Sequence, residues 1–379
     1  MKVLFITNVP SPYRVDFFNE LGKYCDLTVI FQKKRSKERK KYWDGFKIQN
    51  FKYFFIGGIN TSTDSSFSFK IYKLIKQHKD HEIIVDGISP VANIAAIFYM
   101  KRHKIPYYLE IDGGKPNPES KKIRDKLKDR FKKRICNDAK GYFSSGKNAD
   151  EYFIRYGANP NKIHRYPFTS LFEKDLSLIP LPEQEKNALK EEVGLKEKRC
   201  IVTVGRFTYQ NGYGKGFDIF CELAKREKEK DIGFYIIGDE PTKEFLEIKN
   251  KNELTHLHFL PFFKKEELFK FYKACDLTMI LSRGDVWGLV VNESLANGIP
   301  VISSDLCLAG TELIENEKNG FVVSLDDVNE ILNTTEKMLS MPNSYYWNNC
   351  IESIKNYTIE KMAETHLKVL GGTENENLD

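Results

Sequence analysis

The sequence predicts an α/β protein with two Rossmann-like, doubly wound parallel sheets in series. Two observations lead to this fold class. Short apolar runs, each suited to one buried strand, alternate with longer amphipathic segments, and the alternation starts afresh in the second half of the 379-residue chain. Between the halves, residues 167–188 contain Pro180 and Pro182, which interrupt regular structure and mark the expected joint. A chain of this length is long for one domain and sufficient for two.

The first half supplies the elements of one sheet. Strands are expected at residues 3–7, 27–31, 53–56, 83–85, 107–111 and 141–144. Helices are expected at residues 15–21, 69–77, 92–102 and 150–156. Because strands alternate with helices, neighbouring strands should run parallel, and ligands should bind at the carboxyl ends of the strands.

The second half supplies a second set of elements. Strands are expected at residues 201–204, 234–237, 257–260, 277–281, 301–303 and 321–323. Helices are expected at residues 217–230, 243–249, 266–274, 289–296 and 328–339, followed by amphipathic segments at 345–357 and 359–370 and a polar tail at 371–379. We therefore expect an N-terminal domain at residues 1–170, a C-terminal domain at 171–355, and a terminal helix with its tail at 356–379.

Composition and cysteine usage exclude several classes of protein. The chain is 41% hydrophobic, yet no apolar run approaches the ~20 residues that a membrane-spanning helix needs. It opens on a strand-like run at residues 2–6 that is too short for a signal peptide, so we expect a cytoplasmic protein. Seven cysteines without C-x-x-C spacing predict reduced thiols, mostly in the core. The histidines form no ligand pattern, so we expect no metal.

The segment at residues 282–300 combines the features of a sugar-nucleotide pocket. It follows a buried strand, crosses a glycine-containing turn and enters a helix. Asp285 lies in the turn, and Glu293 lies about one turn inside the helix. Carboxylates suit sugar hydroxyls, and the free N–H groups at the helix start suit a phosphate. These N–H groups belong to the neighbourhood of Gly288, Leu289 and Val290.

A glycine-rich loop provides the second signal. Residues 204–207 end a strand with Gly205 and Arg206, and residues 211–218 place Lys215 among glycines ahead of a helix. Glycines let the backbone approach a ligand, and two cations suit a diphosphate. A glycine-rich turn with solvated cations is the alternative, and it is favoured for such a loop alone. Together with the acidic segment, in order and at matching strand ends, the loop favours the binding interpretation.

The two segments resemble retaining glycosyltransferases of the GT-B fold, in particular the large family 4. Asp285 and Glu293, with seven residues between them, resemble its E-x7-E signature. The resemblance implies that Arg206 and Lys215 hold the donor diphosphate and offset the charge that develops as the glycosidic bond breaks. It implies that Glu293 accepts hydrogen bonds from the ribose and that Asp285 contacts the transferred sugar. The family usually has Glu where this chain has Asp285, which bears on donor choice or activity.

The resemblance also names residues around the base. Gly238 and Asp239 close another strand and resemble the family's turn beside the base. Phe262 follows the next strand and either walls the base or packs as a core aromatic residue. The base itself is not readable from these residues. Among nucleoside diphosphate donors, we favour a UDP-sugar.

In the N-terminal half, the resemblance directs attention to two loops at strand ends. Asn8, Tyr13 and Arg14 lie in the first loop, which in GT-B enzymes faces the cleft between the domains; stiffening of a turn by its prolines is an equal alternative. Asp112 stands where many relatives carry a His that contacts the donor sugar. A carboxylate there could bind a sugar hydroxyl or help to stabilise oxocarbenium charge. As in the family, the last helix should pack on the N-terminal domain.

Residues 121–134 carry nine basic side chains, with Ile123, Leu127 and Phe131 at every fourth position. This pattern predicts an amphipathic helix with a cationic face. A solvated face is the usual explanation. With the basic run at residues 33–41, however, we favour peripheral contact with the anionic inner face of a membrane, at about 1 kcal/mol per basic residue, and a lipid-linked acceptor. No motif supports nucleic acid as a partner.

The sequence therefore predicts a retaining, hexosyltransferase-type enzyme that moves a sugar from a nucleoside diphosphate to a glycan or lipid-linked acceptor in surface polysaccharide or glycoconjugate synthesis. The donor is a substrate, so no cofactor is expected. Two alternatives stay open. A sugar-nucleotide epimerase of the same fold would form product without an acceptor. A non-catalytic partner of a glycosyltransferase, which Asp285 and Asp112 also suggest, would show no turnover alone.

Overall fold

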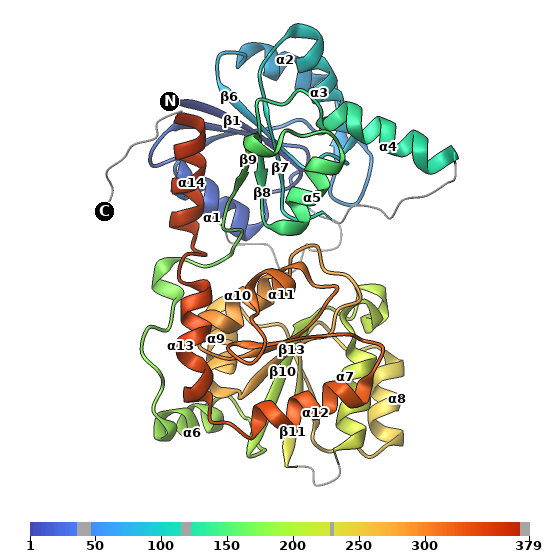
Figure 1. Cartoon of the computed structure of the whole chain (residues 1–379), viewed down its shortest axis with the longest axis vertical. Helices are drawn as coiled ribbons and strands as arrows, with labels where there is room; N and C mark the ends of the chain where they lie inside the picture. Colours follow the sequence, from blue (N-terminus) through green and yellow to red (C-terminus); the bar gives the residue numbers. More distant parts are fainter. Residues whose placement is uncertain (36–46, 115–122, 228–230, 372–379) are drawn as a thin grey trace. The chain divides into compact units, whose positions relative to one another are not determined.

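The computed structural model describes residues 1–35, 47–114, 123–227 and 231–371 (Figure 1). It divides into two compact units, one of Met1–Ser170 with Tyr357–Asp379 and one of Leu171–Asn356. Four of the predicted segments extend outside the described residues. These are the basic run at 33–41 after residue 35, the first two residues of the run at 121–134, the last three of the helix at 217–230, and the tail after residue 371.

A parallel sheet in the order β3-β2-β1-β6-β7-β8-β9 organises the first unit. Its strands are β1 (Lys2–Thr7), β2 (Asp26–Phe31), β3 (Lys52–Phe55), β6 (Glu82–Asp86), β7 (Tyr108–Ile111), β8 (Gly141–Ser144) and β9 (Ile163–Arg165). After their first residues, β1 and β2 are buried throughout. Strands of a parallel sheet are covered on both faces, which explains why these two read as unbroken apolar runs.

Helices cover this sheet (Figure 1), and the unit also contains a short antiparallel pair of strands. The helices are α1 (Pro12–Leu21), α2 (Lys70–Gln77), α3 (Val91–His103), α4 (Ile123–Cys136), α5 (Lys147–Arg155) and α14 (Ile359–Gly371). The pair consists of β4 (Ile59–Asn60) and β5 (Ser66–Phe67). Sequence reasoning missed β4, β5 and β9, because strands of two or three residues are too short to show a period. It placed the start of α1 three residues late, because Pro12 is tolerated in the first turn, where helical N–H groups have no partner.

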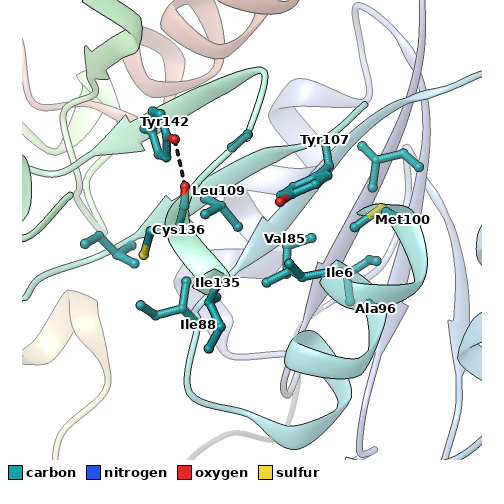
Figure 2. Close-up of a cluster of buried hydrophobic side chains, with 14 of the residues drawn as sticks. Ile6, Val85, Ile88, Ala96, Met100, Tyr107, Leu109, Ile135, Cys136 and Tyr142 are labelled. Atoms are coloured by element: carbon teal, nitrogen blue, oxygen red, sulfur yellow. Dashed lines mark hydrogen bonds between the residues drawn. The ribbon is translucent and has the colours of Figure 1, made fainter. Parts of the chain in front are cut away.

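The core of the first unit forms where adjacent strands meet α3. Ile6, Val85 and Leu109 are register partners on β1, β6 and β7, and each is fully buried. Figure 2 shows them beside Ala96 and Met100 of α3. This packing is the largest favourable contribution to the stability of such a unit, at about 25 cal/mol for each Å² of apolar surface removed from water.

The second unit repeats the design with the strand order β12-β11-β10-β13-β14-β15, all parallel. The strands are β10 (Arg199–Gly205), β11 (Ile232–Gly238), β12 (Leu257–Leu260), β13 (Leu277–Ile280), β14 (Val301–Ser304) and β15 (Gly320–Val323). The helices are α6 (Glu183–Glu192), α7 (Phe217–Arg226), α8 (Lys243–Lys251), α9 (Lys265–Ala274), α10 (Leu289–Ala296), α11 (Leu308–Leu313), α12 (Val328–Leu339) and α13 (Asn343–Ile354). The fold class predicted from the sequence is confirmed.

Helix α6 begins inside the segment at 167–188 that was predicted as an irregular joint, and it extends beyond that segment to Glu192. Pro182 occupies its N-cap position, where a missing N–H costs nothing, so the prolines end just before the helix begins. Lys186 and Lys190 of α6 both bind the buried carboxylate of Asp276, at 2.7 and 3.0 Å. These contacts attach α6 to the sheet of the second unit, and no local pattern in its polar sequence indicates them.

The state of the cysteines and the length and polarity of the helices agree with what the composition predicts. All seven cysteines are free thiols, and six of them are buried. Among the residues that the structure describes, every helix is too short or too polar to cross a bilayer.

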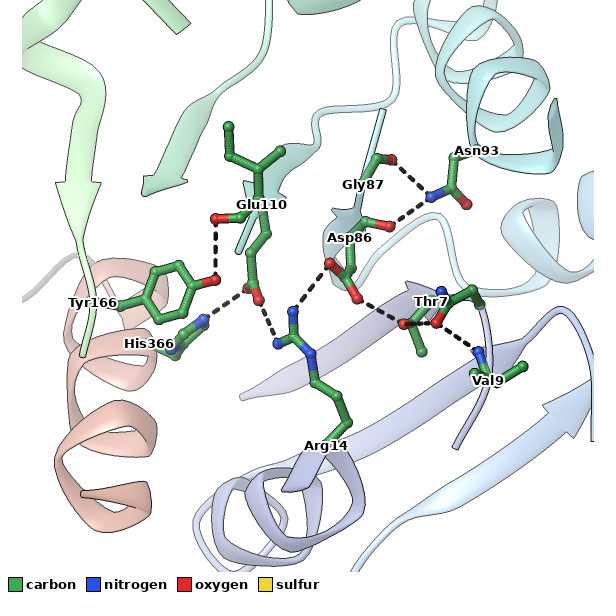
Figure 3. A network of polar contacts seen from close by, with 11 residues as sticks. Thr7, Val9, Arg14, Asp86, Gly87, Asn93, Glu110, Tyr166 and His366 are labelled. Carbon is green, nitrogen blue, oxygen red and sulfur yellow. Dashed lines mark hydrogen bonds and ion pairs between the residues drawn. The ribbon is translucent and has the colours of Figure 1, made fainter. Parts of the chain in front are cut away.

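A buried polar network joins α1 and α14 to the strand ends of the first unit (Figure 3). The guanidinium of Arg14, on α1, lies between two carboxylates, 2.5 Å from Glu110 and 3.0 Å from Asp86. Nε2 of His366, on α14, lies 2.9 Å from the second oxygen of Glu110. The hydroxyl of Thr7 donates to Asp86 at 2.6 Å. Since Arg14 is only 3% exposed and Glu110 and His366 are fully buried, each charge in the network depends on its partners.

Aromatic rings complete the attachment of α14, which packs against α1 in the first unit as expected (Figure 1). The His366 ring stacks on Phe143 at 4.3 Å and also meets Phe17 and Tyr166 at 4.8 and 5.1 Å. Phe17 belongs to α1 and Phe143 to β8. The last described helix is therefore fixed to the first unit by both apolar and polar contacts.

The pKa values of the two carboxylates in this network are shifted in opposite directions. Burial raises the pKa of Asp86 to about 7 against the effect of Arg14, and the neighbouring Glu110 and Asp112 act in the same direction as burial. For Glu110, burial is outweighed by Arg14 and His366, which lower its pKa to about 2. One guanidinium shared by two carboxylates thus favours charge on Glu110 and a proton on Asp86.

This difference predicts a pH-dependent effect of Asp86→Asn. Between its ordinary value of 3.8 and about 7, Asp86 keeps its proton only in the folded protein, so its contribution to the unfolding free energy falls as pH rises. Relative to the unaltered protein, the variant should therefore gain about 2–3 kcal/mol between pH 5 and pH 8. Urea unfolding of both proteins at the two pH values measures this. The exposed Asp26→Asn, whose carboxylate pairs with Lys52, is the control. An equal difference between variant and unaltered protein at both pH values would contradict the prediction.

Candidate active site

The turn between β13 and α10 holds Asp285 by backbone contacts to the segment after β14. The Asp285 amide donates to the carbonyl of Leu306 at 3.2 Å, and the Leu308 amide donates to the carbonyl of Asp285 at 3.4 Å. Gly288 has φ = 104° at the N-cap of α10, and an added Cβ would overlap Sγ of Cys307. Only glycine suits that position.

Sequence reasoning missed the segment at residues 306–308, which supports the acidic turn. Its own residues carry no chemical signal. Its location was nevertheless available from topology, because β14 neighbours β13 and the two strands run parallel. Their carboxyl ends must meet at one edge of the sheet.

The glycine-rich loop between β10 and α7 lies directly on the end of β13. The loop contains the 3₁₀ turn η3 (Gln210–Lys215) and ends at Gly216, which has φ = 71°. A Cβ at position 216 would overlap the carbonyl oxygen of Leu281, and a Cβ on Gly238 would overlap that of Gly205. These glycines allow the ends of β10, β11 and β13 to approach one another closely.

Asp239, which was predicted to lie beside the base, accepts hydrogen bonds from the segment that follows β10. One of its carboxylate oxygens accepts the backbone N–H of Phe207. The other accepts the amide and the hydroxyl of Thr208, at 3.3 and 2.8 Å. Asp239 therefore fixes the backbone that follows Arg206 at the end of β10.

Lys215 and Asp285, which the sequence assigned to different parts of a donor, contact each other. Nζ of Lys215 lies 2.5 Å from Oδ2 of Asp285, and their side chains are 21% and 22% exposed. The Tyr209 ring lies 5.5 Å from the same ammonium group. The pair is accessible to a ligand and shielded enough for its electrostatic interaction to exceed that of a fully exposed pair.

The other residues predicted to bind the donor lie at the same edge of the sheet. Arg206 follows β10 and is partly exposed, as is Gly205. Leu289 and Val290 form the partly exposed first turn of α10. Glu293 lies one turn further, where the Tyr272 hydroxyl donates to its carboxylate at 3.3 Å. Burial, with the Glu293 charge beside it, raises the pKa of the Tyr272 hydroxyl well above its ordinary value, so Tyr272 stays a donor.

Phe262 is 49% exposed in the turn after β12, so it is not a core aromatic residue. The next residue, Phe263, stacks on Phe271 of α9 at 4.6 Å. The alternative of a core role, which the sequence left open for Phe262, is therefore wrong.

In the first unit, the structure corrects the interpretation of Arg14. Arg14 was expected in a loop that faces the cleft between the domains, but its guanidinium is buried between Asp86 and Glu110 and forms part of the core network. The sequence could not show this, because the two carboxylates lie 72 and 96 residues away. Asn8 accepts the Val9 amide at 2.7 Å and so shapes its own turn.

Two predicted residues of the first unit keep partly exposed side chains. The ring of Tyr13 packs edge-on against Phe168 at 5.7 Å. Asp112 follows the buried strand β7, two residues after Glu110. Tyr13 lies in the first turn of α1, whereas Asp112 directly follows β7, and the predicted contacts of both residues with a ligand remain predictions.

Comparison with known proteins identifies the family. A model of the family described as glycosyl transferases group 1 matches residues 185–377, which is just over half of the chain. The chain belongs to this family. One curated relative of this chain is an uncharacterized 41.2 kDa protein in the cps region of Klebsiella pneumoniae, which is 26% identical to it over 185 residues. That match covers 49% of this chain and 48% of the relative, so the chain spans about half the length of the curated relatives it matches.

Solved structures match the group 1 chain over nearly its whole length. HepE of Anabaena, in complex with UDP and glucose, has a TM-score of 0.75 and 14% identity, and the match covers 98% of this chain and 100% of HepE. WaaG, a glycosyltransferase involved in lipopolysaccharide biosynthesis, has a TM-score of 0.67 and 13% identity, with coverage of 98% and 100%. At these identities the likeness concerns the fold alone, and it confirms the GT-B fold.

Within the parts of this group 1 chain that the structure describes, no cluster of three or more His, Cys, Asp or Glu side chains has the arrangement of a metal site. The groups that gather at the strand ends are two basic side chains, two carboxylates and a helix N-terminus. Such a set suits an anionic ligand that also carries hydroxyl groups.

The close approach at Gly216 predicts a large effect of Gly216→Ala. The new Cβ would overlap the Leu281 carbonyl in a backbone conformation with φ = 71°, so we expect the unfolding free energy to fall by more than about 2 kcal/mol. Gly284→Ala is the matched control, because an added Cβ there meets no atom within 4 Å. Urea unfolding measures both variants, and equal stability of the two would show that the loop does not rest on β13.

Proposed function

We propose that the protein is a retaining glycosyltransferase that moves a sugar from a nucleoside diphosphate donor, with a UDP-sugar favoured, to a glycan or lipid-linked acceptor. The observation that carries this proposal is the contact of Lys215 with Asp285 at adjacent strand ends, close to the start of α10. A cation for a diphosphate and a carboxylate for a sugar hydroxyl are thereby held side by side. Family membership and the fold of HepE, a structure with UDP and glucose, support the proposal.

Because Lys215 and Asp285 already contact each other, a donor must first separate them in order to bind both. The diphosphate competes with Asp285 for the Lys215 ammonium, while Arg206 supplies a second cation. Asp285, released from Lys215, accepts a hydrogen bond from a hydroxyl of the donor sugar. Glu293 accepts hydrogen bonds from the ribose, and the N–H groups at the start of α10 bind phosphate oxygens.

The chemical step transfers the sugar to an acceptor hydroxyl with its anomeric configuration retained. The bond from the sugar's anomeric carbon to the diphosphate breaks, the acceptor oxygen bonds to the same face of that carbon, and the acceptor proton passes to the departing phosphate. Arg206 and Lys215, rather than a metal ion, offset the charge on the leaving group. In this scheme Asp112 stabilises positive charge on the sugar ring, the role that a His has in many relatives.

Asp285 is the position at which donor choice is expected to differ from that of relatives with Glu. Its side chain is one methylene shorter, and it already reaches Lys215. A donor hydroxyl must therefore lie closer to the turn than a Glu would require. The involvement of WaaG, which is similar in fold, in lipopolysaccharide biosynthesis supports the proposed acceptor class.

Removal of either cation tests the proposed reaction. Arg206→Ala and Lys215→Ala should each lower transfer by about 100-fold or more, because each removes a group that stabilises the leaving diphosphate. Calorimetry with UDP, GDP and ADP identifies the base, and a panel of sugar nucleotides with it then measures turnover. Lys225→Ala, which removes a side chain that is 54% exposed on α7, is the control and should turn over normally. Circular dichroism confirms that each variant is folded.

Three outcomes of that experiment would oppose the proposal. Near-normal transfer by Arg206→Ala or Lys215→Ala would contradict the assigned roles. Product formed from the sugar nucleotide without any acceptor would indicate an epimerase. No turnover by the unaltered protein, without improvement in Asp285→Glu, would indicate a non-catalytic partner.

We further propose that the protein works on the inner face of a membrane, which it contacts through α4. The exposed surface of α4 combines cations with two apolar side chains, Leu127 at 58% and Phe131 at 47% exposure. Its exposed cations are Arg124, Lys126, Lys128, Arg130, Lys133 and Arg134. Asp129 offsets little of this charge at the surface, because it pairs with Arg155 of α5 at 3.3 Å. Anionic headgroups and acyl chains together suit such a face.

Charge reversal on α4 tests the membrane contact. Lys126→Glu with Arg130→Glu should lower binding to vesicles of phosphatidylcholine and phosphatidylglycerol by about tenfold or more, since each basic residue contributes about 1 kcal/mol. Co-sedimentation measures the binding, with pure phosphatidylcholine vesicles as the neutral surface. Lys243→Glu with Lys251→Glu makes the same charge change on exposed positions of α8 and is the control. Equal binding by the two double variants would exclude α4 as the contact.

A further inference from the structure

Arg283 joins the two loops that carry Lys215 and Asp285. It lies after β13, two residues before Asp285. Its guanidinium binds both carboxylate oxygens of Asp218, at 2.6 and 2.7 Å. The same group donates to the carbonyl of Tyr213 at 2.6 Å, and the Arg283 amide donates to the carbonyl of Gly214 at 3.0 Å. Arg283 thus contacts the glycine-rich loop on both sides of Lys215.

Asp218, the carboxylate partner of Arg283, belongs to a helix. It lies in the first turn of α7, which begins directly after Gly216. The segment from Tyr213 to Asp218 is therefore attached to Arg283 at its start and at its end. Lys215 lies between the two attachment points, and its ammonium reaches Asp285 on the same loop as Arg283.

Other contacts on the loop involve Tyr213, whose hydroxyl donates to Glu244 of α8, and the Gly216 amide, which donates to the Tyr213 carbonyl at 3.0 Å. Glycine occupies positions 212, 214 and 216, and Gly212 and Gly216 have φ angles of 85° and 71°. Glycine loses more conformational freedom on ordering than any other residue, so a loop of this composition needs contacts that fix it. The Arg283–Asp218 pair is bidentate, and two parallel hydrogen bonds restrict orientation as well as distance.

We propose that Arg283 is a positioning residue, which orders the glycine-rich loop so that Lys215 meets the donor diphosphate beside Asp285. This inference rests on the proposed function. Arg283 does not itself bind the donor in this scheme, because its guanidinium is already engaged by Asp218 and Tyr213. Lysine cannot replace it, since a single ammonium group does not match both oxygens of a carboxylate and a carbonyl at once.

Hydrogen exchange in the ligand-free protein tests the ordering. Arg283→Ala and Asp218→Ala should each accelerate amide exchange at residues 210–216 by about tenfold or more, because the loop opens more often. Arg226→Ala is the matched control. Arg226 lies on α7, as Asp218 does, and its side chain is 36% exposed, against 39% for Arg283. It pairs with Glu222 of the same helix, at a distance of 2.9 Å, and this pair does not involve the loop. Unchanged exchange in Arg283→Ala would overturn the proposal.

Kinetics with UDP-glucose, or with whichever sugar nucleotide is turned over, tests the consequence. Arg283→Ala and Asp218→Ala should lower kcat/KM by about 10- to 100-fold, and the double variant should lose no more than either single one. Arg283→Lys should behave like Arg283→Ala. In a Lys215→Ala background, Arg283→Ala should have no further effect, which a general loss of stability would not reproduce. Arg226→Ala should keep full activity.

The outcomes separate this inference from the proposed function. Normal activity of Asp218→Ala beside a loss in Arg283→Ala would show that Arg283 contacts the donor directly, and would overturn the positioning role. If the unaltered protein binds no UDP, GDP or ADP by calorimetry and turns over no sugar nucleotide, the proposed function fails. Hydrogen exchange then decides by itself whether Arg283 orders the loop.

Discussion

The ion pair of Lys215 with Asp285 depends on a parallel sheet. The two residues lie 70 positions apart and meet because β10 and β13 are adjacent and end at the same edge. Glycines at positions 216 and 288 let the backbone of each loop come close enough for the side chains to touch. The pair holds a cation and a carboxylate in accessible positions before any ligand arrives. A ligand with anionic oxygens and hydroxyl groups can replace both halves of the contact, and a sugar nucleotide has both.

The first unit also has a basic side chain beside carboxylates at the ends of its strands, but there the ion pairs are buried. Arg14 also lies between carboxylates, but it is 3% exposed, whereas Lys215 is 21% exposed. A buried guanidinium without partners would be very costly, so Asp86 and Glu110 act here as structural partners of Arg14. Exposure therefore separates a structural ion pair from a site, although both lie where parallel strands end. His366 extends the structural network to α14 and so makes the last helix part of the first unit.

Family membership and the geometry of the site both agree with a glycosyltransferase. The family match includes most of the second unit, where the strand ends gather Arg206, Lys215, Asp285 and Glu293. The likeness to HepE and WaaG extends the shared fold over both units at low identity. Asp285 departs from the E-x7-E signature that this segment of the sequence resembles. Its short side chain, engaged by Lys215, makes donor choice the property in which this protein is most expected to differ.

The sequence by itself determined the order and type of most elements, because strands buried on both faces appear as apolar runs and amphipathic helices separate them. Local spacing was also sufficient to select Lys215 and Asp285, since glycines, charges and a helix start lie close together in the chain. Only the tertiary structure decided that Arg14 is buried, that Asp239 braces a loop, and that Arg283 ties Lys215 in place. Each of these facts concerns partners at least 31 residues apart, joined by the sheet. No local pattern encodes such contacts, because they depend on which strands become neighbours.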